Sequence, residues 1–378
     1  MSHADRERRG CPRALIAGFA ALLAGPCLLW PLVRGMCDTT NYENRTLAAF
    51  PTADTGVRAW PAAFEEWLGD HAPFRNQFLT LKSGADRLVG TLDSTNVLLG
   101  REGWMFLKDV SDSKSLSDYQ GLTAYSAGET AAMAEALTAL NDVLAAKGSR
   151  LVLLFAPAKE GVYSRYMPDS VPVVSRPTRV GALAGALGET GVPVLFPLEE
   201  LQAAALERQV YYKYDTHWNE AGAWLAAQLT LEALDRPFAA AWPEMAPDPE
   251  KAPLTDLANM CGSWAWCTDD VYWALEAEAA ECTLWEAGGE IARYAGAGEG
   301  SLLLARDSFG EALAPWLAQG FESATVLHGN QMQVATLLEW QPDLPDVVVL
   351  EVAERFSDNL LSRLETLRQW ADVRGHVE

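Results

Sequence analysis

The chain has 378 residues, of which 49% are hydrophobic and 21% are charged, which is enough to bury a core in one large or two modest domains. The formal net charge of −22 argues against nucleic acid as a partner and against broad adhesion to anionic lipid, since both are polyanionic. For the same reason a strongly polyanionic substrate is disfavoured unless a local basic patch receives it.

The N-terminal segment is the basic exception. Four arginines, at positions 6, 8, 9 and 13, precede an uncharged apolar run over residues 14–33, which is long enough to cross a bilayer as a helix. Basic residues before such a run keep that end in the cytoplasm. We therefore predict a cytoplasmic tail (1–13), a transmembrane signal anchor (14–33) in the inner membrane and a periplasmic domain (38–378). A long, cleaved signal peptide is the alternative.

Four cysteines would be exported with that domain: Cys37, Cys261, Cys267 and Cys282. An even number in an oxidising compartment predicts at least one disulfide, whose pairing the sequence leaves open. No Cys-x-x-Cys or clustered histidines accompany them, so we predict no metal site and no cofactor.

Beyond residue 100, strand-like and helix-like segments alternate. Ser126 and Glu129 form a capping box that opens a helix to about residue 147, and Arg150–Ala156 is an apolar run of strand length. The predicted helices that follow cover residues 177–187, 198–208, 219–234, 310–319, 334–340 and 359–370, and the predicted strands 192–196, 302–305, 324–327 and 347–352.

Residues 239–300 interrupt this alternation. They are rich in proline, tryptophan and cysteine, so we predict an insertion packed on the main domain. The alternation itself predicts an α/β fold, with a parallel sheet flanked by helices and a site at the carboxyl ends of the strands.

Two stretches carry candidate chemistry. Asp215 and His217 lie in YYKYDTHWNEAGAW, and Ser308 follows an apolar strand and precedes a helix. An acid that orients a histidine base, which in turn activates a serine, is the arrangement that nucleophilic acyl transfer requires. Backbone N–H groups of residues 308–310 would then hold an oxyanion. The alternatives are a helix-capping Ser308 and an Asp-x-His pair on the surface or in a metal half-site.

Other residues near these stretches are candidates for substrate binding. Trp218 could line a saccharide groove, although packing in the core is the alternative for any one tryptophan. Lys159 and Arg306 lie near predicted strand ends, where they would bind substrate oxygens or be solvated.

Taken in order along residues 41–356, these stretches resemble the periplasmic alginate O-acetyltransferase family and its DHHW-type relatives, which have an SGNH-hydrolase-like fold. The resemblance lies in NYENRTLAAFP, DHAPFR, GREGWMFL, APAKEGVYSRYMP, YDTHWNEAGA, DSF and VVLEVAERF. The chain has DTHW instead of DHHW, which fits the acetyltransferase branch better, and Arg306 stands where the family often has glycine.

The resemblance implies roles for particular residues. Asp215 and His217 would be acid and base and Ser308 the nucleophile, while Lys159 and Tyr163 belong to its Pro-x-Lys-x-x-x-Tyr segment and would bind substrate. It implies acetyl transfer to hydroxyls of an exported polysaccharide, with a multi-pass membrane acyltransferase as donor partner. A carbohydrate acetylesterase with the same triad, or a polysaccharide-binding assembly subunit without activity, are the alternatives.

Overall fold

The computed structural model describes residues 3–41, 46–91, 94–236 and 241–374. Some predictions fall on residues outside this part. They concern the start of the basic tail (1–2), residues 42–45 of the NYENRTLAAFP stretch, the first residues of the insertion (239–240) and the end of the domain (375–378). The chain divides into two compact units. Unit 1 comprises residues 1–93 and 258–268, and unit 2 comprises residues 94–257 and 269–378.

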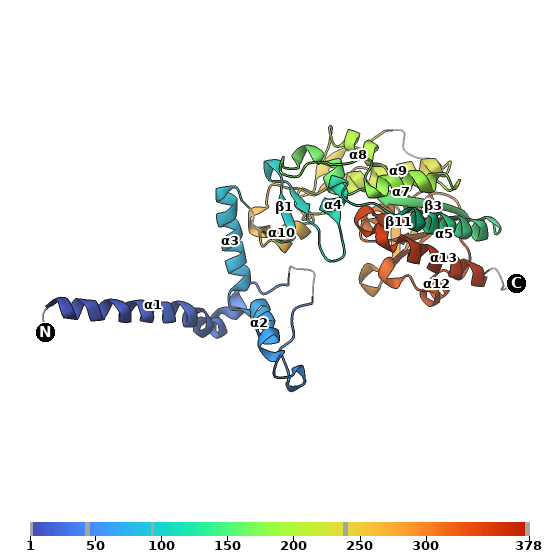
Figure 1. Ribbon diagram of the computed structural model, residues 1–378. Helices are drawn as coiled ribbons and strands as arrows, with labels where there is room; N and C mark the ends of the chain where they lie inside the picture. Colours follow the sequence, from blue (N-terminus) through green and yellow to red (C-terminus); the bar gives the residue numbers. More distant parts are fainter. Residues whose placement is uncertain (1–2, 42–45, 92–93, 237–240, 375–378) are drawn as a thin grey trace. The chain divides into compact units, whose positions relative to one another are not determined.

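The described residues of unit 2 are built around a seven-stranded sheet with the order β4-β3-β11-β9-β10-β8-β7 (Figure 1). Strands β4, β3, β11, β9 and β10 are parallel, whereas β8 and β7 are antiparallel. The strands are β3 (Arg150–Ala156), β4 (Val194–Leu195), β7 (Glu281–Glu286), β8 (Ile291–Ala295), β9 (Ser301–Arg306), β10 (Ser323–His328) and β11 (Val347–Ala353).

Helices cover both faces of the sheet because the central strands are apolar on both sides. On β9, Leu302 and Leu304 face one buried cluster while Leu303 and Ala305 face the other. The first cluster includes α8 (Leu198–Ala204), α9 (Glu220–Ala233) and α11 (Gly310–Ala318). The second includes α5 (Ala127–Ala145), α7 (Arg179–Gly188), α12 (Val334–Trp340) and α13 (Leu360–Arg374). The predicted α/β architecture, a sheet flanked by helices, is thus confirmed.

The predicted helix caps are also present. Ser126 and Glu129 form the reciprocal capping box of α5. The Asn219 side chain accepts hydrogen bonds from the backbone N–H groups of Ala221 and Gly222, so α9 begins where the sequence indicates.

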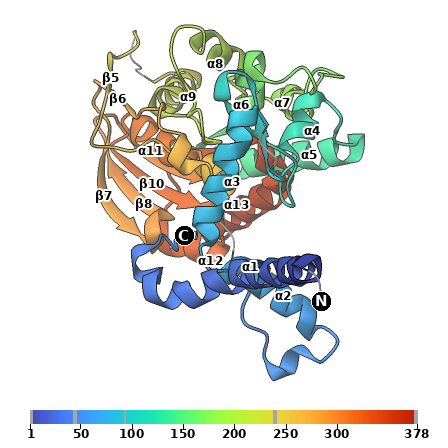
Figure 2. The same ribbon diagram turned by 90° about the vertical axis from the view of Figure 1, so that its left-hand side faces the viewer.

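The segment 241–300 corrects the prediction of an all-parallel sheet. Its last part supplies β7 and β8, which extend the sheet beyond β10 (Figure 2). Its first part holds the antiparallel pair β5 (Met245–Pro247) and β6 (Trp273–Leu275) and the short helix α10 (Asp256–Met260). Antiparallel strands can follow one another through a tight connection, so this segment adds them without a crossover helix.

Shorter elements precede the sheet. Strands β1 (Val97–Leu99) and β2 (Met105–Leu107) pair antiparallel, and β2 lies in the GREGWMFL stretch. The helix α4 (Ser115–Gln120) follows them, and α6 (Lys159–Val162) comes directly after β3.

Unit 1 contains α1 (His3–Val33), α2 (Trp60–His71) and α3 (Arg75–Val89). Within the described residues, the stretch Arg13–Met36 is apolar and long enough to cross a membrane by length and composition, with a mean hydropathy of 2.0. Helix α3 packs against residues 262–266: the Trp266 indole donates to the Thr80 carbonyl at 2.9 Å, and the Ser83 hydroxyl to the Gly262 carbonyl at 2.7 Å.

The predicted disulfide is not found. Among the described residues, no disulfide joins Cys37, Cys261, Cys267 and Cys282 to one another. Two of them have polar partners in unit 1: Cys261 donates to the Ala258 carbonyl, and the Arg87 guanidinium donates to the Cys267 sulfur.

Candidate active site

His217 lies in a tight loop just before α9. The loop is closed by an isolated antiparallel bridge between Tyr211 and Trp218 and by a hydrogen bond from the Tyr212 N–H to the His217 carbonyl. Asp215 Oδ1 accepts hydrogen bonds from the His217 backbone N–H, at 2.9 Å, and from the imidazole Nδ1, at 2.7 Å. One carboxylate oxygen therefore fixes both the backbone and the ring of the histidine.

Ser308 follows β9, at the turn into α11. Its Oγ lies 2.8 Å from His217 Nε2, so the structure brings Asp215, His217 and Ser308 into one hydrogen-bonded chain. With Nδ1 facing a carboxylate as donor, Nε2 is the acceptor for the serine proton. This is the geometry in which a histidine removes the proton of a nucleophilic serine.

Ser308 does not cap α11, whose N-cap residue is Phe309 without a side-chain cap, and Asp307 instead holds the turn before the helix. Its Oδ1 accepts from the Phe309 N–H at 3.0 Å, and its Oδ2 accepts from the Ala353 N–H at 2.6 Å. The serine hydroxyl is thus left for His217. The Phe309 N–H is occupied by Asp307, which corrects the expectation that this group serves an oxyanion.

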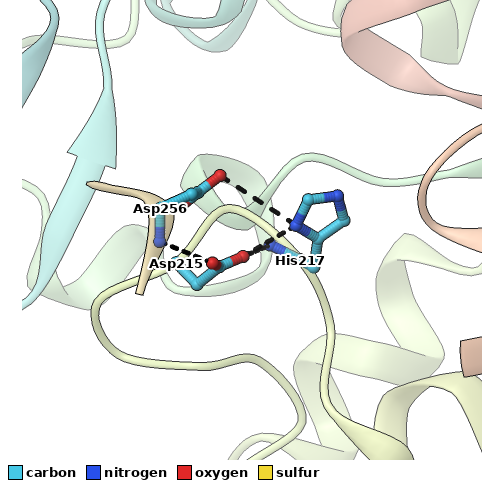
Figure 3. A group of neighbouring side chains, drawn as sticks. All are labelled: Asp215, His217 and Asp256. Atoms are coloured by element: carbon cyan, nitrogen blue, oxygen red, sulfur yellow. Dashed lines mark hydrogen bonds and ion pairs between the residues drawn. The ribbon is translucent and has the colours of Figure 1, made fainter. Parts of the chain in front are cut away.

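A second carboxylate, which sequence reasoning missed, lies beside the pair. Asp256, at the start of α10, is 4.0 Å from His217 Nδ1, and its backbone N–H donates to Asp215 Oδ2 at 2.7 Å (Figure 3). Asp256 also accepts from the Thr216 N–H, at 2.8 Å, and from the Thr216 hydroxyl, at 2.6 Å.

The two acids have opposite pKa shifts. Burial opposes ionisation of Asp215, but its hydrogen bond and charge attraction with His217 hold its pKa at about 2. Burial and the neighbouring Asp215 carboxylate raise the pKa of Asp256 to about 6, against the opposing charges of His217 and Arg355.

By distance alone, Asp215, His217 and Asp256 could also hold a metal ion. However, each oxygen of both carboxylates already accepts a hydrogen bond from the chain. An ion would have to displace these donors, so the arrangement suits proton transfer better than metal binding.

The four residues predicted to bind substrate are buried and hold the site together instead. The Lys159 ammonium donates to the carbonyls of Tyr212, Lys213 and Asp215 at 3.2, 3.1 and 2.5 Å, and only 1% of the residue is exposed. It thus anchors the loop that carries Asp215, and the prediction that it contacts substrate oxygens is wrong.

The other three residues require the same correction. The Tyr163 hydroxyl accepts from the Val210 N–H, and the Trp218 indole donates to the Phe309 carbonyl at 2.9 Å, which ties the histidine loop to the serine turn. Arg306 donates to the carbonyls of Asp307 and Gly289. All three are at least 97% buried, and the hydrogen bonds named here position the backbone around the site.

Arg355 is a second residue that sequence reasoning missed. It follows β11, and its guanidinium lies 5.5 Å from the ring of Phe309, the residue after Ser308. Together with Thr216 and Phe309 it lines a small hollow, and its Nε is buried with no hydrogen-bond partner among the described residues. In the sequence, only the position of Arg355 directly after an apolar strand, in AERF, could have indicated that it belongs to the site.

Comparison with known proteins is consistent with this arrangement. Residues 97–262 match the family described as "SGNH hydrolase-like domain, acetyltransferase AlgX". The chain is 25% identical over 197 residues to a probable alginate O-acetylase AlgJ of Pseudomonas syringae pv. tomato, and 31% over 146 residues to that of Pseudomonas putida. These alignments cover 52% and 37% of this chain and 48% and 34% of the relatives, so the chain matches half or less of their length.

Among solved structures, the O-acetyltransferase domain of Pseudomonas putida AlgJ is 19% identical, with a TM-score of 0.43, over 72% of this chain and 99% of that one. A DHHW family protein from Eubacterium siraeum is 14% identical, with a TM-score of 0.48, over 72% of this chain and 98% of that one.

Proposed function

Because residues 97–262 form an SGNH hydrolase-like domain homologous to the AlgJ alginate O-acetylases, we propose that this protein transfers acetyl groups onto hydroxyls of an exported polysaccharide. The observation that carries the proposal is the chain of hydrogen bonds from Asp215 through His217 to Ser308. The polysaccharide substrate is inferred from the names of the relatives, since the geometry by itself supports acyl transfer in general.

The proposed reaction has two halves. Ser308 Oγ attacks the carbonyl carbon of an acetyl donor while His217 Nε2 takes its proton; the donor's leaving oxygen or sulfur departs with that proton, and acetyl-Ser308 remains. A sugar hydroxyl then attacks acetyl-Ser308, gives its proton to Nε2, and leaves as the acetyl ester while Ser308 regains its proton. Asp215 stabilises the imidazolium in both halves.

Arg355 would support both halves from its place beside Phe309, the residue after Ser308. Its unpartnered Nε and its place beside Phe309 suit a role in binding the acyl oxygen on which negative charge develops. It would supply the stabilisation that the Phe309 N–H, held by Asp307, does not.

Topology and partners belong to the same proposal. The segment Arg13–Met36 would anchor the chain in the inner membrane with residues 38–378 in the periplasm. Acetyl donors of the cytoplasm would then need a multi-pass membrane acyltransferase to present the acetyl group. An acetylesterase, in which water replaces the sugar hydroxyl, is the second candidate, because the same three residues serve both reactions.

The test is to incubate the purified full-length protein with an activated acetyl ester, with and without a saccharide acceptor. Ser308→Ala is expected to abolish acetyl-enzyme formation seen by intact-protein mass spectrometry, and His217→Ala to reduce it to a similar extent, since triad members act as a unit. Transfer at the parent rate by the Ser308→Ala protein would refute the assignment. Release of free acetate alone, whatever the acceptor, would replace the transferase with the esterase.

A further inference from the structure

Asp256 is joined to the proposed catalytic chain at two points. Its backbone N–H holds Asp215 Oδ2, and its carboxylate holds both the backbone N–H and the hydroxyl of Thr216. Thr216 stands between the acid and the base, so Asp256 fixes the whole Asp-Thr-His turn from outside it. The contact joins residues 41 positions apart in the sequence.

Asp256 also places a second negative charge beside the imidazole. Its Oδ2 is 4.0 Å from His217 Nδ1, whereas Asp215 Oδ1 is at 2.7 Å. A carboxylate at 4 Å is beyond hydrogen-bonding distance but close enough for a substantial Coulomb interaction.

The groups that face Asp256 come from several elements. Asp215 is the like charge, His217 and Arg355 are the opposite charges, and the Thr216 hydroxyl is the hydrogen-bond donor. Lys159, at the start of α6, also interacts electrostatically with Asp256. Two carboxylates therefore share one histidine, with Lys159 and Arg355 as the flanking cations.

We propose that Asp256 is a positioning residue for His217, holding the Asp-Thr-His turn through Asp215 and Thr216 and stabilising the imidazolium by its charge. The inference rests on the proposed function of the triad and adds a fourth member to it. When His217 takes the serine proton, the new positive charge lies between two carboxylates, one hydrogen-bonded and one at 4.0 Å.

The stabilisation of the His217 imidazolium by the Asp256 charge should disappear in mild acid. The pKa of Asp256 is about 6, so its carboxylate is charged at pH 8 and mostly neutral at pH 5. An asparagine keeps the backbone N–H that holds Asp215, and its side-chain oxygen can still accept from Thr216, so Asp256→Asn mainly removes the charge. The variant should therefore resemble the parent at low pH and differ from it at high pH.

The experiment measures the rate at which a sulfonyl fluoride labels Ser308 in the full-length protein between pH 5 and 8. Labelling forms a bond between Ser308 Oγ and sulfur, releases fluoride, and passes the serine proton to His217, so it reports the base without any saccharide. We expect the parent to react about sixfold faster than Asp256→Asn at pH 8, because one unit charge at about 4 Å is worth about 1 kcal/mol in a water-like medium, and about twofold or less at pH 5.

Asp270→Asn is the matched control. The Asp270 carboxylate holds the same loop, accepting from the Lys213 N–H at 2.6 Å and from the Gln209 amide at 2.7 Å. Burial also raises the pKa of Asp270, so this control measures how much pH dependence a buried carboxylate of the loop causes without a contact to His217 among the described residues. We expect its rate ratio to change less between pH 5 and 8 than that of Asp256→Asn.

The outcomes separate the two proposals. If the parent is labelled at Ser308 but the ratio of its labelling rate to that of Asp256→Asn is constant from pH 5 to 8, the inference about Asp256 is overturned and the triad stands. If the parent is not labelled at Ser308 at any pH, the proposed function and the inference both fall.

Discussion

Lys159 offers the sharpest test of how the site is held, because its proposed roles make opposite predictions. Its ammonium is buried and donates to three backbone carbonyls of the loop that carries Asp215. Lys159→Met keeps a side chain of similar length and apolar character but removes all three donors. The carbonyls of Tyr212, Lys213 and Asp215 then lose these partners without access to water in their place.

The expected loss of stability follows from these contacts. A hydrogen bond to a charged group contributes about 1.5–3 kcal/mol, so three contribute roughly 5–9 kcal/mol. Burial lowers the pKa of Lys159 from 10.5 to about 8, which corresponds to a cost of roughly 3 kcal/mol for keeping the ammonium charged. Lys159→Met should therefore reduce the free energy of unfolding by about 2–6 kcal/mol and lower Tm by roughly 3–8 °C for a chain of this size.

The assay combines thermal unfolding of the full-length protein with steady-state kinetics on an activated acetyl ester. We expect Tm and kcat to fall while KM changes little, because the loop moves but no substrate contact is lost. Lys213→Met is the control, since its ammonium pairs with the exposed Asp269 and should contribute less than about 1 kcal/mol. An unchanged Tm with a raised KM would refute this reasoning and restore Lys159 as a substrate-binding residue.

Two further outcomes are expected. Burial raises the pKa of Glu354 from 4.5 to about 7. Between these pH values the folded protein therefore keeps the proton on Glu354, whereas the unfolded chain has released it. The free energy of unfolding should thus fall by roughly 3 kcal/mol as pH rises from 4.5 to 7, and Glu354→Gln should remove this slope in urea titrations. A periplasm-active reporter fused after Glu378 should give signal; activity of a cytoplasm-only reporter there would contradict the anchored topology.

Local patterns in the sequence predicted most of the fold. The run Arg150–Ala156 is the strand β3 because seven consecutive residues suit a strand buried on both faces. Asn219 caps α9 because its side chain can satisfy two N–H groups at the helix start. Strand β7 was missed because an exposed edge strand such as Glu281–Glu286 has neither apolar continuity nor clear alternation, and β8 because its five residues are too short a run to stand out.

The sequence predicted those site residues whose place follows from the order of strands and helices along the chain. Residues after parallel strands meet at one edge of the sheet, so Ser308 could be placed near the histidine loop before any coordinates. Asp256 could not be placed near the histidine loop, because it lies in a segment without periodicity and its contact with Thr216 depends on how that segment folds back. The sequence also cannot distinguish a lysine or arginine that faces substrate from one that caps buried carbonyls, as Lys159 and Arg306 do.

The charges around His217 bear on the acceptor as well as on the base. Lys159 is buried among the carboxylates of Glu160, Asp215, Asp256 and Asp270, and its ammonium is bound to backbone carbonyls. Lys159 and Arg355 are the cations that line the hollow, and of the two Arg355 has the unpartnered donor and lies beside Phe309. If that donor serves the acyl oxygen, the described lining leaves no unengaged cation for a uronate carboxylate, since the Lys159 ammonium is held by carbonyls. With a net charge of −22, we expect the enzyme to acetylate a neutral, hydroxyl-rich polysaccharide in preference to a polyuronate.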